Sequence, residues 1–241
     1  MVHFLGHYYD PTAFWTMIAI LGAGVYGLVF YLFTAWSKQA ERIDDVVDTL
    51  TTKVGQIQWY LDGLPKSEDA VRKPFEEGMA ALHAFKWDEV IGHFTTAMTH
   101  AAGTRLVALL NLIGLCHYAL CRWQQALAGL EESASLADLF QDSHGKAAAL
   151  GNMGLVFRAQ GELDKALQYQ EEALAIARGV GYQRGAATAL GNMGNIHLDK
   201  GEFDKAIEYL ESGLSMDREI GDPQGEASTL GNVRGRLPGQ G

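Results

Sequence analysis

Residues 151–190 read GNMGLVFRAQGELDKALQYQEEALAIARGVGYQRGAATAL, and residues 191–230 repeat that pattern as GNMGNIHLDKGEFDKAIEYLESGLSMDREIGDPQGEASTL. The two stretches align without a gap and match at 17 of 40 positions. A period of this length is typical of a solenoid, in which each unit buries its apolar face only against its neighbours. The repeat therefore predicts how most of the chain is built.

Each stretch has the apolar spacing of two helices. The helical period breaks at Gly161 and at Gly201, ten residues after each GNMG motif begins, and then resumes. Gly181 and Gly221 are predicted to end the second helices, because glycine adopts the left-handed conformation of a C-cap at the least cost. Small residues recur where the two helices of a pair are expected to approach closely: Gly154, Ala166, Gly194 and Ala206.

This pattern resembles the tetratricopeptide repeat, a helix–turn–helix unit, in a long form of 40 residues. The resemblance implies an all-α solenoid of four units and the start of a fifth: residues 71–106, 107–146, 147–186 and 187–226. In the second unit, Cys121 stands where a turn glycine is expected. After residue 230 the register gives way to an irregular tail, residues 231–241, and two interpretations fit it: a natural tail, or a truncated version of a longer array.

A second feature lies near the N-terminus, after a tail of residues 1–12. Residues 13–36 carry no charged side chain, and a helix of that length spans roughly 36 Å, enough to cross a hydrocarbon core of about 30 Å. A cleaved signal peptide would need a basic start and a shorter apolar core. Basic residues follow this segment and none precedes it, so we predict a single-pass membrane protein whose repeats face the cytoplasm.

Residues 37–64 are predicted to form a juxtamembrane helix with a coiled-coil seam. Its apolar residues alternate spacings of four and three, as the a and d positions of a parallel dimer do. The seam consists of Ile43, Val47, Leu50, Val54, Ile57 and Leu61. Two interpretations stay open: a homodimer that forms along this seam, and an amphipathic helix that packs on the first repeat.

Composition and motifs argue against nucleic-acid binding and catalysis. The net charge of −10 leaves no basic stripe for phosphates. The sequence contains no P-loop, dinucleotide fingerprint or Ser/His/Asp set, so we predict no catalytic residue. Cys116 and Cys121 lack the spacing of zinc or redox motifs, and His3 and His7 supply only two ligands. We therefore predict no metal and no cofactor.

A series of asparagines gives the chain a candidate binding surface. Asn152, Asn192 and Asn232 recur every 40 residues on first helices, and Asn111 lies one residue off this register. The family resemblance implies that first helices line a concave groove, in which asparagines of related proteins hold the backbone of an extended peptide. A primary amide suits that task because it both donates and accepts hydrogen bonds. Arg158 would add positive charge. The alternative is that each asparagine caps or bridges neighbouring repeats.

Together these features predict a membrane-tethered scaffold for protein–protein interactions, with a protein or peptide partner in the groove. The alternative is an accessory subunit or assembly factor of a larger membrane complex, in which the span does the recognising. The carboxylate clamp of chaperone-type relatives is not expected, because the first repeat carries Glu76 and Glu77 and no asparagine on its opening helix.

Overall fold

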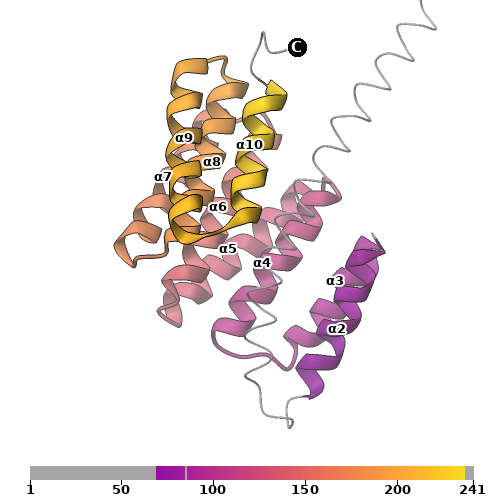
Figure 1. Ribbon diagram of the computed structural model, residues 1–241. Coiled ribbons are helices and arrows are strands. Elements are labelled where there is room, and N and C mark those ends of the chain that lie inside the picture. The colour runs from indigo at the N-terminus through magenta and orange to yellow at the C-terminus, as the bar shows by residue number, and fades with distance from the viewer. Residues whose placement is uncertain (1–68, 85, 237–241) are drawn as a thin grey trace, which may run out of the picture. The chain divides into compact units, whose positions relative to one another are not determined.

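The computed structural model describes residues 69–84 and 86–236, which form nine α-helices and no strand (Figure 1). The helices follow one another as pairs: α2 (Asp69–His83) with α3 (Trp87–Met98), α4 (Thr104–Ala119) with α5 (Trp123–Leu139), α6 (Ser143–Ala159) with α7 (Leu163–Gly179), and α8 (Gln183–Asp199) with α9 (Phe203–Ile220). A further helix, α10 (Pro223–Arg236), follows the last pair. All described residues belong to one of the two compact units of the chain, residues 48–241.

Each helix packs against its neighbours in the chain, and the first helices of successive pairs also pack against each other. α4 contacts α6, α6 contacts α8, and α8 contacts α10. A solenoid grows in this way, because every pair covers the apolar face of the pair before it. The prediction of an all-α repeat solenoid is therefore confirmed for the described residues.

Within a pair, a glycine of the first helix lets the second helix come close. A Cβ atom added to Gly154 would lie 3.2 Å from the carbonyl oxygen of Ala166, and one added to Gly194 would lie 3.2 Å from that of Ala206. Only a residue without a side chain fits such a short distance from the backbone without a shift. The helices of these two pairs therefore approach closely at these four residues, as the sequence predicted.

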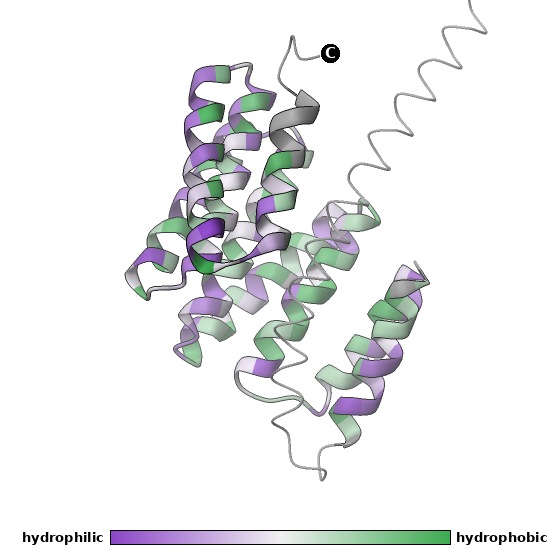
Figure 2. Ribbon diagram, in the orientation of Figure 1, coloured by the Kyte–Doolittle hydropathy of each residue, from purple (hydrophilic) through white to green (hydrophobic). Residues whose placement is uncertain are grey.

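α4 differs from the second helices in how much of its surface is apolar. α4 is mostly hydrophobic (Figure 2), and 11 of its 16 residues are buried. A helix that is apolar on all sides must be covered on all sides. The second helices are amphipathic instead: α7 buries Ala166, Ala173 and Ala177, while Glu171 and Glu172 are exposed.

The turns between helices share one hydrogen-bonding motif. The four predicted turn glycines have φ values from 66° to 81°: Gly161, Gly181, Gly201 and Gly221. After Gly161, the N–H of Glu162 donates to the carbonyl oxygen of Phe157 at 2.9 Å, which is the long bond of a Schellman motif. The predicted ends of these helices are confirmed.

Cys121 and Gln141 take the same left-handed conformation without being glycine. Their φ values are 56° and 55°. The Schellman bond still forms after Gln141, because the N–H of Asp142 donates to the carbonyl oxygen of Ala137 at 2.8 Å. A side chain in this conformation costs about 1–2 kcal/mol, so the second repeat keeps the turn geometry at a cost that the later repeats avoid.

The prediction of a single-pass membrane protein with its repeats in the cytoplasm is corrected here. No helix among residues 69–84 and 86–236 is long and apolar enough to cross a membrane. The longest of these helices, α9, has 18 residues and carries charged side chains such as Asp204 and Lys205. Residues 13–36, on which the prediction rested, lie outside the described residues.

Three further predictions involve residues at the ends of the described region. The N-terminal tail and the stalk of residues 37–64, with its dimer seam from Ile43 to Leu61, lie outside the described residues. At the other end, α10 continues to Arg236, whereas the sequence register suggested an irregular tail from residue 231. α10 has a strong start, because Pro223 occupies its first turn and the N–H of Gly225 donates to the side chain of Asp222 at 3.3 Å.

Replacing Gln141 with glycine should stabilise the protein. The Gln141→Gly change removes the strain of a side chain at positive φ, and glycine already occupies the equivalent positions 181 and 221. We expect a gain of about 1 kcal/mol in the free energy of unfolding, measured by urea denaturation. The reverse change, Gly181→Gln, should lower it by a similar amount. A lower urea midpoint for Gln141→Gly would contradict the assignment of strain to this turn.

Candidate functional site

The exposed side of two neighbouring first helices forms the candidate site. On α8, Arg184, Thr188 and Asn192 follow one another at every fourth residue and are exposed or half-buried. This spacing places them on one side of the helix. On α6, His144 and Ala148 occupy the matching positions and are also accessible. We call the surface of these five residues the first-helix face.

Two of the predicted asparagines are buried between α4 and α6. Asn111 is 4% exposed and Asn152 is 2% exposed. The Nδ2 atom of Asn152 donates to Oδ1 of Asn111 at 3.3 Å, and Nδ2 of Asn111 donates to the carbonyl oxygen of Gly145 at 3.3 Å. These amides therefore join successive repeats, as in the alternative interpretation of the asparagine series, and offer almost no surface to a ligand.

Asn192 is the predicted asparagine that reaches the first-helix face, where it is half-buried. Asn195 lies one turn further along the same side of α8 and was not singled out by the sequence, although its spacing from Asn192 could have indicated it. It is 5% exposed, and its Oδ1 atom accepts no hydrogen bond. Asn232 lies in α10, and its side chain is outside the described residues.

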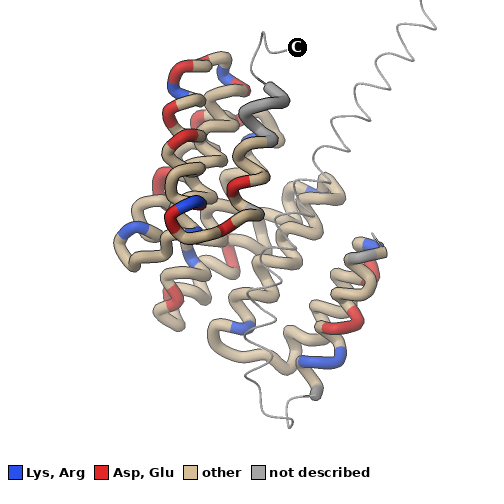
Figure 3. The backbone as a smooth tube through the Cα atoms, in the orientation of Figure 1, with Lys and Arg blue, Asp and Glu red and all other residues tan. Residues whose placement is uncertain are grey.

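The two arginines near this face are paired with carboxylates of the next unit. Nε of Arg158 lies 2.5 Å from Oδ2 of Asp199, and Nε of Arg184 lies 2.8 Å from Oδ2 of Asp222. The predicted positive charge of Arg158 is therefore balanced, and its side chain is only 13% exposed. Figure 3 shows acidic residues along the second helices. The exposed glutamates of α5, α7 and α9 include Glu131, Glu132, Glu171, Glu172, Glu208 and Glu211.

Histidine and cysteine are often reactive groups in enzymes, but His197 and Cys116 contribute to packing in this structure. The ring of His197 stacks on Tyr209 with a centroid distance of 5.1 Å, as the ring of Phe157 stacks on Tyr169 one repeat earlier. Burial raises the pKa of the Cys116 thiol to about 12, which keeps it protonated and unreactive. Among residues 69–84 and 86–236, no group of three His, Cys, Asp or Glu side chains could hold a metal ion.

The burial of the asparagines predicts opposite results for two alanine substitutions. Asn152→Ala breaks the bridge between α4 and α6 and leaves Oδ1 of Asn111 buried without this donor, so it should lower the free energy of unfolding by about 1–3 kcal/mol. Asn192→Ala should change it by less than about 0.5 kcal/mol, because the side chain is half-buried on an open face. Urea denaturation of both variants tests this, and equal losses would contradict the distinction.

Comparisons with known proteins identify the repeat. The sequence model of the tetratricopeptide repeat family matches residues 104–179 and 145–219, whereas no curated protein matches the chain in sequence. Aspartyl phosphate phosphatase F from Bacillus subtilis is similar in structure, with 18% identity and a TM-score of 0.64 over 73% of this chain and 47% of that chain.

Two further solved structures share the fold. One is a Rap protein complexed with competence and sporulation factor, with 18% identity and a TM-score of 0.58 over 73% of this chain and 56% of that chain. The other is BtubC from P. vanneervenii, with 14% identity and a TM-score of 0.59 over 79% and 81%. This chain spans about half the length of the phosphatase and of the Rap protein. At such identities the likeness shows the fold alone, and together with the family match it shows that residues 104–219 are built of tetratricopeptide repeats.

Proposed function

We propose that this protein is a non-enzymatic scaffold that binds an extended segment of a partner protein along the first-helix face of α6 and α8. The observation that carries the proposal is the composition of this surface and of the glycines beside it. Its accessible residues include small, uncharged ones and one amide: Ala148, Gly151, Thr188, Gly191 and Asn192. Small side chains let the main chain of a ligand approach closely, and the amide of Asn192 matches the donor and acceptor of a peptide bond.

The character of the fold supports a binding role. Tetratricopeptide repeats are typical of protein-interaction scaffolds, and one of the structural neighbours, the Rap protein, is complexed with a second molecule. A surface that continues from one first helix to the next suits a ligand that is itself a chain. We also propose that the repeats are a 40-residue form, because the helices of the third and fourth pairs begin at that interval.

Three of the polar groups on or near the face, those of Arg158, Arg184 and Thr188, are already paired and so are poor candidates for a nucleophile or a general base. Arg158 and Arg184 are held by carboxylates, and the hydroxyl of Thr188 donates to the carbonyl oxygen of Arg184 in its own helix at 2.9 Å. A nucleophile or general base would need a free polar group with a second one in reach. The name of the phosphatase neighbour states an activity of that protein.

The predicted site residues have different roles in this proposal. Asn192 contacts the ligand. Asn111 and Asn152 fix the spacing of α4 and α6, because they bond to each other across the two helices. Arg158 fixes the spacing of α6 and α8 through Asp199, and Asn232 continues the series on α10.

The proposal predicts where a bound peptide can be disturbed. Peptides that bind the full chain would be selected from a display library of random linear sequences, and their Kd values measured against variants. Asn192→Ala should weaken binding roughly 3- to 10-fold for each hydrogen bond to the peptide that it removes, because such a bond is worth about 0.5–1.5 kcal/mol. Thr188→Arg should weaken it more, because a long charged side chain would fill the surface along which the peptide lies.

The matched control is Glu171→Arg, an equally large change at an exposed position of α7. It should leave the Kd unchanged, because α7 is a second helix and contributes nothing to the first-helix face. Peptides that bind as tightly to Thr188→Arg as to the unchanged chain, or that lose affinity only with Glu171→Arg, would overturn the proposal.

A further inference from the structure

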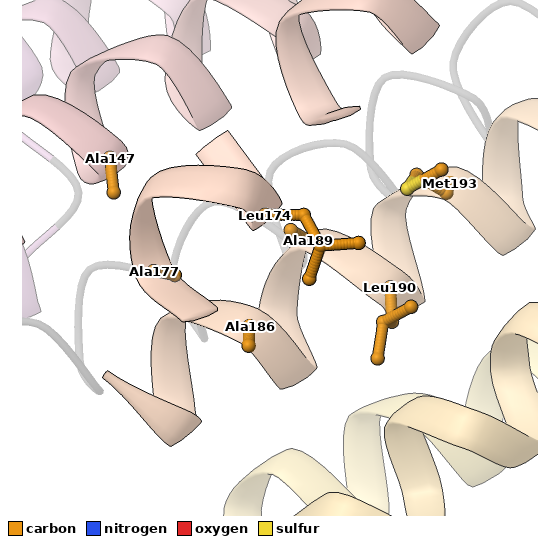
Figure 4. Close-up of a cluster of buried hydrophobic side chains, with 7 residues drawn as sticks. All are labelled: Ala147, Leu174, Ala177, Ala186, Ala189, Leu190 and Met193. Atoms are coloured by element: carbon orange, nitrogen blue, oxygen red, sulfur yellow. The ribbon is translucent and has the colours of Figure 1, made fainter. Parts of the chain in front are cut away.

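Three equivalent positions recur where α5 packs against α6 and where α7 packs against α8. Counting by the 40-residue period, they are Ala137, Gly145 and Ala149 between α5 and α6, and Ala177, Gly185 and Ala189 between α7 and α8. The four alanines are at most 3% exposed. Figure 4 shows Ala177 and Ala189 within the apolar cluster between α7 and α8. These two interfaces contain no titratable side chain at the three positions.

In the interface between α9 and α10, two of these three positions carry polar side chains. The three residues are Asp217, Gly225 and Thr229. Asp217 is 4% exposed, and Oγ1 of Thr229 donates to its Oδ2 atom at 3.3 Å. A Cβ atom added to Gly225 would lie 2.6 Å from Oδ1 of Asp217. The carboxyl group of Asp217 is therefore in close contact with the first turn of α10.

A second buried carboxylate, that of Asp222, lies near the carboxyl group of Asp217, and few positively charged side chains are close to the two. Asp222 is 4% exposed and pairs with Arg184 at 2.8 Å. The remaining charges here are those of Arg218 and Glu226, which pair with each other at 2.9 Å. Burial raises the pKa of Asp217 to about 6, and the charge of Asp222 adds to the rise. The Thr229 hydrogen bond and Arg184 act in the opposite direction, while Glu226 raises the pKa further.

We propose that Asp217 makes the docking of α10 on α9 a pH-sensitive step, in which α10 is held most firmly while this carboxyl group is protonated and less firmly once it ionises. The sign follows from linkage between protonation and docking. A carboxyl group whose pKa is raised in the docked state, from its ordinary value of 3.8 to about 6 for Asp217, contributes its full stabilisation below the lower value. That contribution is lost as the pH rises through the upper value.

The consequence for binding rests on the proposed function. α10 contacts α8 and carries Asn232, so among the described residues it follows α8 in the row of first helices. Weaker docking of α10 at higher pH would loosen the helix that continues the row of first helices beyond the first-helix face of α6 and α8. The docking step itself requires no partner, so it can be tested without one.

Hydrogen exchange of the full chain, without any partner, measures the docking directly. After correction for the intrinsic exchange rate, protection of peptides from residues 223–236 should fall roughly tenfold between about pH 5 and about pH 7.5, as expected when a carboxyl pKa of about 6 in the docked state returns to its ordinary value of 3.8 in the undocked one. Peptides from residues 183–199 are the internal control. Their interface has Ala177 in place of Asp217, so their protection should not follow this change.

Two variants distinguish this carboxyl group from other acids. Asp217→Ala restores the residue found at the equivalent positions, so it should fold and abolish the pH dependence of the protection of α10. Asp204→Asn, at an exposed position of α9, should behave like the unchanged chain.

Equal protection of α10 at both pH values in the unchanged chain would overturn the proposal, and so would an unaltered pH dependence in Asp217→Ala. Either result would leave peptide binding along α6 and α8 unaffected. A failure of peptide binding would in turn leave the docking of α10 unaffected.

Discussion

The close approach of two helices at a glycine is the constraint on which the rest of the structure depends. In each of the four pairs, a Cβ atom added to one glycine of the first helix would lie only 2.6–2.7 Å from a bulky side chain of the second helix. The side chains and their glycines are Phe94 at Gly78, Leu130 at Gly114, Gln170 at Gly154 and Leu210 at Gly194. Because the pairs close in the same way, they can stack at a constant interval. The stacking in turn brings the first helices into one row and creates the face that we assign to a partner.

The third pair departs from this pattern, because the residue pressed against its glycine is polar. Gln170 is fully buried, and its Nε2 atom donates to the carbonyl oxygen of Gly151 at 2.8 Å. Its Oε1 atom has no hydrogen-bond partner, which costs about 1–3 kcal/mol. Leu130 and Leu210, at the equivalent positions, have no such cost. Together with the strained turn residues Cys121 and Gln141, this shows that the repeats share a geometry and differ in how well their residues suit it.

The sequence predicted the helix pairs well, because glycine position and apolar period report directly on backbone conformation and on the buried side. It could not predict the different surroundings of Asn152 and Asn192, which occupy the same place in successive repeats. Asn152 is buried against Asn111 of the preceding first helix, whereas the residue equivalent to Asn111 before Asn192 is Gly151, which has no side chain to offer. The pairing of Arg158 with Asp199, 41 residues away, could not be predicted from the sequence either, because it depends on how two repeats stack.

The most direct test of the role of close approach compares two glycine-to-alanine substitutions within helices. In Gly194→Ala the new methyl group would meet Leu210 at 2.6 Å and the carbonyl oxygen of Ala206 at 3.2 Å, so the free energy of unfolding should fall by about 1–3 kcal/mol. In Gly129→Ala the methyl group meets nothing within 4 Å, and the better helix propensity of alanine should raise the free energy of unfolding by about 0.5–1 kcal/mol. Opposite signs in urea denaturation are the predicted result. An unchanged or increased stability of Gly194→Ala would contradict the claim that close approach at this glycine holds the pair together.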